Sequence, residues 1–103
     1  MRHTRIATYE ITTGAFQEIA DSAKSGLLPK LRELPGFVRY GVADIADNKL
    51  MSVSLWETHE QAEAASPVAA VWVKENIQDR VQLRENYVGD LAFWQGVKEP
   101  VGA

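Results

Sequence analysis

The chain has 103 residues, of which 46% are hydrophobic and 24% are charged, with a formal net charge of -3 at pH 7 and no cysteine. This length suits one domain with its own hydrophobic core. The interspersed charges exclude the clustered basic face of a nucleic-acid-binding protein, and the lack of cysteine excludes disulfides and zinc sites built on sulfur. There is no apolar run of roughly 20 residues for a membrane helix and no apolar signal block, so we expect a cytoplasmic protein without nucleic-acid or membrane partners.

The first half of the chain predicts a strand, a helix and a second strand. Residues 3 to 12 alternate in polarity as a strand does. Thr13 is the expected N-cap of a helix that runs to about Leu34, and Gly26 and Pro29 predict a kink or a break within it. Gly36 allows the chain to turn after this helix, and residues 37 to 44 then alternate as a second strand.

The second half predicts two further strands around a second helix. Residues 50 to 56 alternate as a third strand, and the polar residues 46 to 49 before it predict a hairpin with the second strand. Thr58 and Gln61 have the spacing of a capping box, which begins a helix directly after the third strand. We expect this helix to run to Ala65, to restart at Ser66 and Pro67, and to end by about Leu83. The last strand is expected over residues 87 to 94, followed by a loose tail over residues 95 to 103.

The resulting order is strand, helix, strand, strand, helix, strand (βαββαβ). It predicts a single α+β domain over residues 1 to 103, with a core from about 3 to 94 and a ferredoxin-like split-βαβ fold. In this fold a four-stranded antiparallel sheet carries two helices on one face. The other face would expose apolar side chains at alternate positions of four strands, more than a monomer normally leaves exposed to water. We therefore predict a homodimer that packs sheet against sheet.

Two short motifs resemble the antibiotic-biosynthesis monooxygenase family. Leu34, Pro35, Gly36 and Phe37 precede the second strand, and Leu55, Trp56, Glu57 and Thr58, with Glu60 and Ala62, follow the third. The resemblance covers about residues 3 to 94 and implies a dimeric α/β barrel. The family includes cofactor-free oxygenases of phenolic substrates, haem-degrading enzymes and isomerases, so the resemblance leaves the chemistry open.

The haem-degrading members of this family use an Asn, a Trp and a His. Alignment with those positions places Ala7, Ala64 and about Lys74 there. All three residues depart from the pattern, so we do not expect haem degradation by that mechanism.

The sequence contains no nucleophile elbow, no glycine-rich phosphate loop and no His and carboxylate residues at a metal-ligand spacing. We accordingly expect no metal and no other cofactor. Aromatic and polar residues remain as candidates to line a pocket between sheet and helices. Trp56 is most simply a core anchor, and Trp72 either walls a pocket or packs in the core. Asn76, one helical turn after Trp72, is either a pocket group or exposed at the edge.

Three further residues complete the candidate site. Tyr9 and Tyr40, on neighbouring strands, can stack on and hydrogen-bond to a phenol or quinone, although packing at a dimer interface is an equal alternative. His59 lies at a helix N-terminus, where the helix dipole favours the neutral imidazole that a general base needs. A solvated His is the simpler alternative for that position.

The leading hypothesis is a cofactor-independent monooxygenase acting on a small phenol- or quinol-type substrate. His59 and Asn76 are its expected catalytic residues, and the expected substrate-binding residues are Tyr9, Tyr40, Trp56 and Trp72. One alternative is a ligand-binding or stress-associated dimeric module without catalysis. Another is a purely structural dimer, which a packed Trp72 and a solvent-exposed Asn76 would favour.

Overall fold

A computed structural model describes residues 2–95. The tail expected over residues 95 to 103 therefore lies outside the described residues, apart from Gln95. The elements in chain order are β1 (His3–Ile11), α1 (Phe16–Ser22), η1 (Ala23–Leu27), α2 (Leu28–Arg32), β2 (Phe37–Ala46), β3 (Lys49–Trp56), α3 (His59–Asn76) and β4 (Val81–Asp90).

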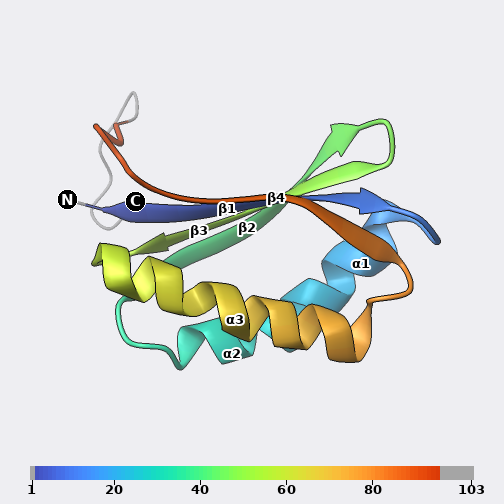
Figure 1. The fold of residues 1–103 in the computed structure, drawn as a ribbon, viewed down its shortest axis with the longest axis horizontal. Helices are drawn as coiled ribbons and strands as arrows, with labels where there is room; N and C mark the ends of the chain where they lie inside the picture. The colour runs from blue at the N-terminus through green and yellow to red at the C-terminus, as the bar shows by residue number, and fades with distance from the viewer. Residues whose placement is uncertain (1, 96–103) are drawn as a thin grey trace.

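The four strands form one sheet in the order β2-β3-β1-β4, and each neighbouring pair is antiparallel. All the helices lie on one face of this sheet, and no described element covers the opposite face (Figure 1). The predicted βαββαβ order and the ferredoxin-like α+β fold are thus confirmed. We call the helix-covered side of the sheet the inner face and the other side the outer face.

The first helical segment has three parts. Between α1 and α2 the chain makes a π turn, η1, in which the Leu28 amide donates to the Ala23 carbonyl five residues earlier. Pro29 follows in the first turn of α2, where a missing amide hydrogen costs little. The irregularity predicted near Gly26 and Pro29 is therefore present as a π turn, although the segment stays helical and does not break.

The predicted Thr13 cap is wrong. The N-cap is Ala15, whose backbone amide donates to Glu18 Oε1 at 3.1 Å. Gly14 has φ +91°, a turn conformation that glycine adopts without strain, and it delays the start of α1 by two residues.

The start of α3 agrees with the sequence. Thr58 Oγ1 accepts a hydrogen bond from the Gln61 amide at 3.2 Å, and Gln61 Oε1 accepts one from the Thr58 amide at 3.1 Å. This reciprocal pair satisfies two amides at the open helix end, which is the capping box that the spacing predicted.

The predicted restart of this helix at Ser66 and Pro67 is wrong, because α3 is continuous from His59 to Asn76. Pro67 lacks an amide hydrogen for the Glu63 carbonyl, but both residues are exposed, so that carbonyl is close to water. On the opposite side of the helix, the buried residues Ala62, Ala65, Ala69 and Trp72 form one continuous stripe. This packing outweighs the preference of proline for the first turn of a helix.

The predicted limits of the last strand are also wrong. The helix ends at Asn76 rather than near Leu83, and β4 spans Val81–Asp90 rather than residues 87 to 94. Val81 pairs with Ile11, and Leu83 pairs with Tyr9. Pairing with β1 therefore makes these residues a strand, although their apolar spacing also suits a helix.

The core lies between the inner face and the helices. Ala7, Tyr9 and Ile11 of β1 are buried there, as are Leu50, Ser52, Ser54 and Trp56 of β3. The Trp56 side chain is 0% exposed; its Nε1 donates to Ser54 Oγ at 2.8 Å, and the ring of Phe37 meets it edge-on at 5.4 Å. Trp56 is thus a core anchor at the junction of β3 and α3.

The outer face carries apolar side chains that the fold leaves accessible. Ile6 of β1 pairs with Val53 of β3 and with Tyr87 of β4, so these three form one cross-strand row. Tyr87 is 56% exposed. Within residues 2–95, no helix combines the length and the hydropathy needed to cross a membrane.

Candidate functional site

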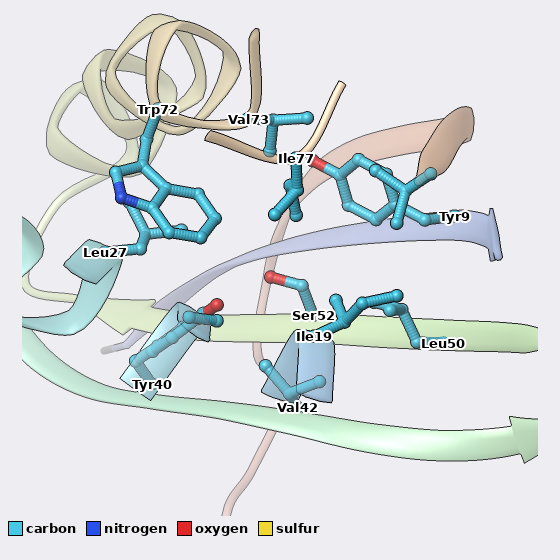
Figure 2. Close-up of a pocket in the computed structure, with 12 residues that line it drawn as sticks. Tyr9, Ile19, Leu27, Tyr40, Val42, Leu50, Ser52, Trp72, Val73 and Ile77 are labelled. Carbon is cyan, nitrogen blue, oxygen red and sulfur yellow. The ribbon is translucent and has the colours of Figure 1, made fainter. Parts of the chain in front are cut away.

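A small cavity lies between the inner face and the helices. Its volume is about 30 Å³, the room of one or two water molecules. Its polar lining consists of Tyr9, Tyr40, Ser52 and Trp72, and the other lining residues are aliphatic. Figure 2 shows the hydroxyls of Tyr40 and Ser52 directed into the space below Trp72, with the ring of Tyr9 reaching toward Ile77.

Burial controls the acidity of Tyr40. Desolvation raises the pKa of its hydroxyl from 10.0 to about 12, and the hydrogen bond to Ser52 opposes this shift in part. The charge of Arg5 also favours ionisation of Tyr40, but its effect is smaller. At neutral pH Tyr40 is therefore a protonated hydrogen-bonding group and a poor general base.

The π turn shapes one wall of this cavity. Ala23 and Leu27, at the two ends of η1, both line it. Gly26 lies directly against Trp72, because a Cβ on residue 26 would be 2.7 Å from Trp72 Nε1. Single π turns within α-helices occur frequently at functional sites, and this one supports the indole that closes the cavity.

An open groove adjoins the cavity between α3 and β4. Its volume is about 550 Å³, within the usual range for small-molecule sites. Tyr9, Val73 and Val81 line both spaces, so the groove and the cavity share a wall. The groove also has two cationic residues, Arg5 and Lys74. None of the described residues that line either space is Asp, Glu or His.

Arg5 is the unusual member of this lining. It lies on the inner face of β1, is 5% exposed, and donates from Nε to Ser66 Oγ at 3.0 Å. The same Ser66 oxygen accepts from Asn86 Nδ2 at 3.5 Å. Ion pairs among residues 2–95 include those of His3, His59 and Arg84, and none of these four contacts involves Arg5. Burial of a cation without a carboxylate partner is costly.

The predicted substrate-binding residues are only partly brought together. Tyr9, Tyr40 and Trp72 meet around the cavity, whereas Trp56 is packed in the core. Asn76, predicted as a catalytic residue, is exposed, and its Nδ2 donates to the Trp72 carbonyl at 2.9 Å, which caps the last turn of α3.

His59, the other predicted catalytic residue, lies at the opposite end of α3 from Asn76. Its Nδ1 is 3.4 Å from Asp90 Oδ1 and its Nε2 is 2.5 Å from Glu63 Oε1. The Asp90 hydrogen bond is the largest cause that raises the pKa of His59 above 6.5. The structure places His59 outside the lining of both cavity and groove.

The same region contains a cluster that the sequence did not indicate. His3, His59 and Asp90 each offer a ligand atom, and these atoms lie within 4.8 Å of one another. His3 Nδ1 also contacts Asp90 Oδ1 at 2.5 Å. These residues come from three different elements, β1, α3 and β4, so no short sequence motif could predict the cluster.

Sequence reasoning also missed Arg5 and Lys74. A signal for Arg5 was present, because it alternates in register with Ala7, Tyr9 and Ile11 and therefore shares their inner face. A charged residue on the buried side of a strand is a candidate functional residue.

Together these features define an α+β protein of the ferredoxin-like class with an inner-face cavity and an adjoining cationic groove. No family model and no curated protein matches the sequence. The fold nevertheless matches solved structures. SnoaB, a cofactor-independent oxygenase from Streptomyces nogalater, is 19% identical with a TM-score of 0.63, over 95% of this chain and 98% of that one.

Two further structures share this fold. A "putative antibiotic biosynthesis monooxygenase" from Chloroflexus aurantiacus J-10-fl is 16% identical, with a TM-score of 0.63 over 95% of this chain and all of that one (100%). A dimeric ferredoxin-like protein from an uncultured marine organism is 11% identical, with a TM-score of 0.68 over 92% of this chain and 98% of that one. The structural neighbours thus include antibiotic biosynthesis monooxygenase-like proteins, and the resemblance stated from the sequence is confirmed for the fold.

Proposed function

We propose that the protein is a small monooxygenase that oxidises a phenol- or quinol-type aromatic compound without a metal or a flavin. The observation that carries the proposal is the open groove that shares a wall with the tyrosine-lined cavity. An aromatic ring needs a space of about 150 Å³. The cavity is too small for it, so the ring binds in the groove, beside Tyr9. The similarity of the fold to SnoaB, a cofactor-independent oxygenase, supports this class of chemistry.

The reaction needs only the substrate and dioxygen. A phenol yields a quinone and water: one oxygen atom enters the ring as the second carbonyl, the other leaves as water, and all four electrons come from the substrate. The phenol first loses its proton to water in the open groove. The positive charges of Arg5 and Lys74 favour the resulting phenolate, which is the form that reduces oxygen.

Oxygen uptake with a panel of hydroquinones and polyphenols tests this proposal. Ala70 lines the groove and is exposed, so Ala70→Trp fills the groove without disturbing the core. Ala64→Trp, at another exposed position of α3, is the matched control. We expect uptake above autoxidation in the wild type, a loss of tenfold or so in Ala70→Trp, and wild-type rates in Ala64→Trp. Absence of uptake across the panel, or full activity of Ala70→Trp, overturns the proposal.

The roles predicted for His59 and Asn76 are tested in the same assay. With the substrate in the groove, His59→Ala is expected to retain wild-type uptake, because His59 does not line the groove. Asn76→Ala is expected to lose helix stability rather than catalysis, because its amide bonds to the Trp72 carbonyl. A large loss of turnover in His59→Ala at unchanged stability would instead support the predicted role of His59 as the general base.

A ligand-binding module without catalysis is the second candidate, and one observation favours it. The described lining residues include no carboxylate and no imidazole, and burial makes Tyr40 a poor base. Ligand binding that Ala70→Trp abolishes, without any oxygen uptake, would select this function. A purely structural dimer is favoured by the 4% exposure of Trp72 and by the exposed Asn76, and it predicts no binding at all.

We also propose that two copies of the chain associate through the outer face. Ile6, Val53 and Tyr87 form an apolar row across three strands there, and no described helix or strand covers them, although Trp94 lines a hollow beside Val53 on the same face. The neighbour described as a dimeric ferredoxin-like protein supports this arrangement. The groove lies on the helix side of the sheet and stays open in such a dimer.

A further inference from the structure

We propose that the groove between α3 and β4 binds an aromatic carboxylate, with the guanidinium of Arg5 as the principal partner of the carboxylate and Lys74 as a second cation. This inference deepens the proposed function and rests on it only for the aromatic part of the ligand. The anion site is argued from the groove itself.

The Arg5 side chain is only partly satisfied by the protein. Its Nε donates to Ser66, and its terminal nitrogens make no hydrogen bond within residues 2–95. No fully buried side-chain nitrogen or oxygen of the described residues lacks a partner. The terminal nitrogens of Arg5 must therefore retain access to solvent, and the groove that Arg5 lines provides it.

Ser66 restrains the guanidinium of Arg5 at one edge. Its oxygen accepts from Arg5 Nε and also from Asn86 Nδ2, so α3 and β4 both hold the partner of that edge. The two terminal nitrogens remain available to a ligand in the groove as a fork. A carboxylate matches that fork with two parallel hydrogen bonds, whereas a neutral hydroxyl offers only one acceptor atom.

The groove combines positive charge with apolar surface. Arg5 and Lys74 are the ionisable cations of the groove, and no Asp or Glu lies among its described lining residues. A bound carboxylate offsets the cost of the buried Arg5 charge. The rest of the lining includes Tyr9, Val73, Val81 and Leu83, which suit an aromatic ring better than a fully hydrated inorganic anion.

The test compares two probes of nearly equal size, 2-naphthoate and the neutral 2-naphthol. Titration calorimetry with the wild-type protein is expected to give at least tenfold tighter binding of 2-naphthoate, since hydrogen bonds to a charged group are the stronger ones. Added salt should weaken the binding of 2-naphthoate much more than that of 2-naphthol. Equal affinity for the two probes overturns the proposal.

Arg5→Met retains the length of the side chain and removes its charge. We expect this variant to lose at least tenfold in affinity for 2-naphthoate, with 2-naphthol within about threefold of wild type. Arg84→Met is the matched control, since Arg84 lies on β4, pairs with Glu10 and does not line the groove. Unchanged 2-naphthoate binding in Arg5→Met contradicts the assignment.

Lys74→Met keeps the proposal testable if Arg5→Met does not fold, because Lys74 is exposed. A several-fold loss for 2-naphthoate alone is expected, and no loss refutes the role of the second cation. The readout is separate from oxygen uptake. If 2-naphthoate binds through Arg5 and no substrate is oxidised, the monooxygenase proposal fails while the anion site stands.

Discussion

Gly26 lies against the indole of Trp72, so closely that a Cβ on residue 26 would be 2.7 Å from Trp72 Nε1. Gly26 belongs to the π turn η1, and Trp72 belongs to α3, so this contact joins the two helical segments over the cavity. The missing side chain, together with the extra residue of the π turn, provides the space in which the indole lies.

Replacement of Gly26 by Ala tests this contact. An alanine in a helix is ordinarily more stable than a glycine by roughly 0.5–1 kcal/mol. Here overpacking against Trp72 costs about 1–3 kcal/mol, so we expect a net loss of about 1 kcal/mol in the free energy of unfolding by urea. Gly89→Ala is the control, because nothing lies within 4 Å of a Cβ there. Wild-type stability of Gly26→Ala would show that the indole moves at no cost.

The raised pKa of Tyr40 predicts a loss of stability in alkali. Below pH 10 the hydroxyl is protonated in both the folded and the unfolded chain. From 10.0 to about 12 the unfolded chain loses this proton while burial retains it in the folded chain. The contribution of the protonated Tyr40 hydroxyl to the free energy of unfolding is fully present below pH 10. It therefore declines through this window, by about 2–3 kcal/mol.

Tyr40→Phe removes this titration. We expect the difference in unfolding free energy between the wild type and Tyr40→Phe to be constant up to about pH 10 and to shift against the wild type above it. Urea denaturation of both proteins at about pH 9 and about pH 11.5 measures it. Parallel pH profiles would mean that the Tyr40 hydroxyl ionises as freely in the folded chain as in the unfolded one.

The cluster around His59 predicts a second pH dependence. The pKa of His59 is raised, first by its hydrogen bond to Asp90 and then by Glu63. Its stabilising effect is therefore fully present below pH 6.5 and is lost as the pH rises through the raised value. Thermal unfolding from about pH 5.5 to pH 8.5 should show a smaller decline in His59→Gln than in the wild type. An identical decline in both proteins contradicts the ion pair.

The proposed dimer is tested on the outer face. Tyr87 is 56% exposed, so Tyr87→Lys leaves the fold intact and places a charge in the proposed interface. We expect the wild type to sediment as a dimer and Tyr87→Lys to shift toward the monomer. Val71→Lys, at a comparably exposed position on α3, is the matched control and should remain dimeric. A monomeric wild type refutes the interface outright.

Local signals in the sequence predicted the elements whose causes are themselves local. The Thr58 cap is confirmed because its two hydrogen bonds join residues three positions apart. The irregularity expected near Gly26 and Pro29 is present as the π turn η1, because a proline removes a backbone donor wherever it lies, but the helical segment does not break there. Alternation in β3 predicted which residues share a face, since the period of a strand fixes the side of each residue, but it did not predict which face the helices cover.

Errors occurred where a distant partner decides between two local preferences. Val81 and Leu83 have apolar spacing that suits a helix, but pairing with Ile11 and Tyr9 makes them a strand. Pro67 indicates a helix start, but the buried alanine stripe of α3 keeps one continuous helix through it. Neither outcome can be calculated without the sheet against which these residues pack.

The sequence by itself determined the order of the elements, the two sets of residues that alternate along each strand and the capping of α3, because periodicity and short-range hydrogen bonds act along the chain. Only the tertiary structure decided where the groove lies, that Arg5 and Lys74 line it together, and that His3, His59 and Asp90 form a cluster. These groups are separated by tens of residues along the chain. Their distances depend on how β1, α3 and β4 pack together, and no local pattern records that packing.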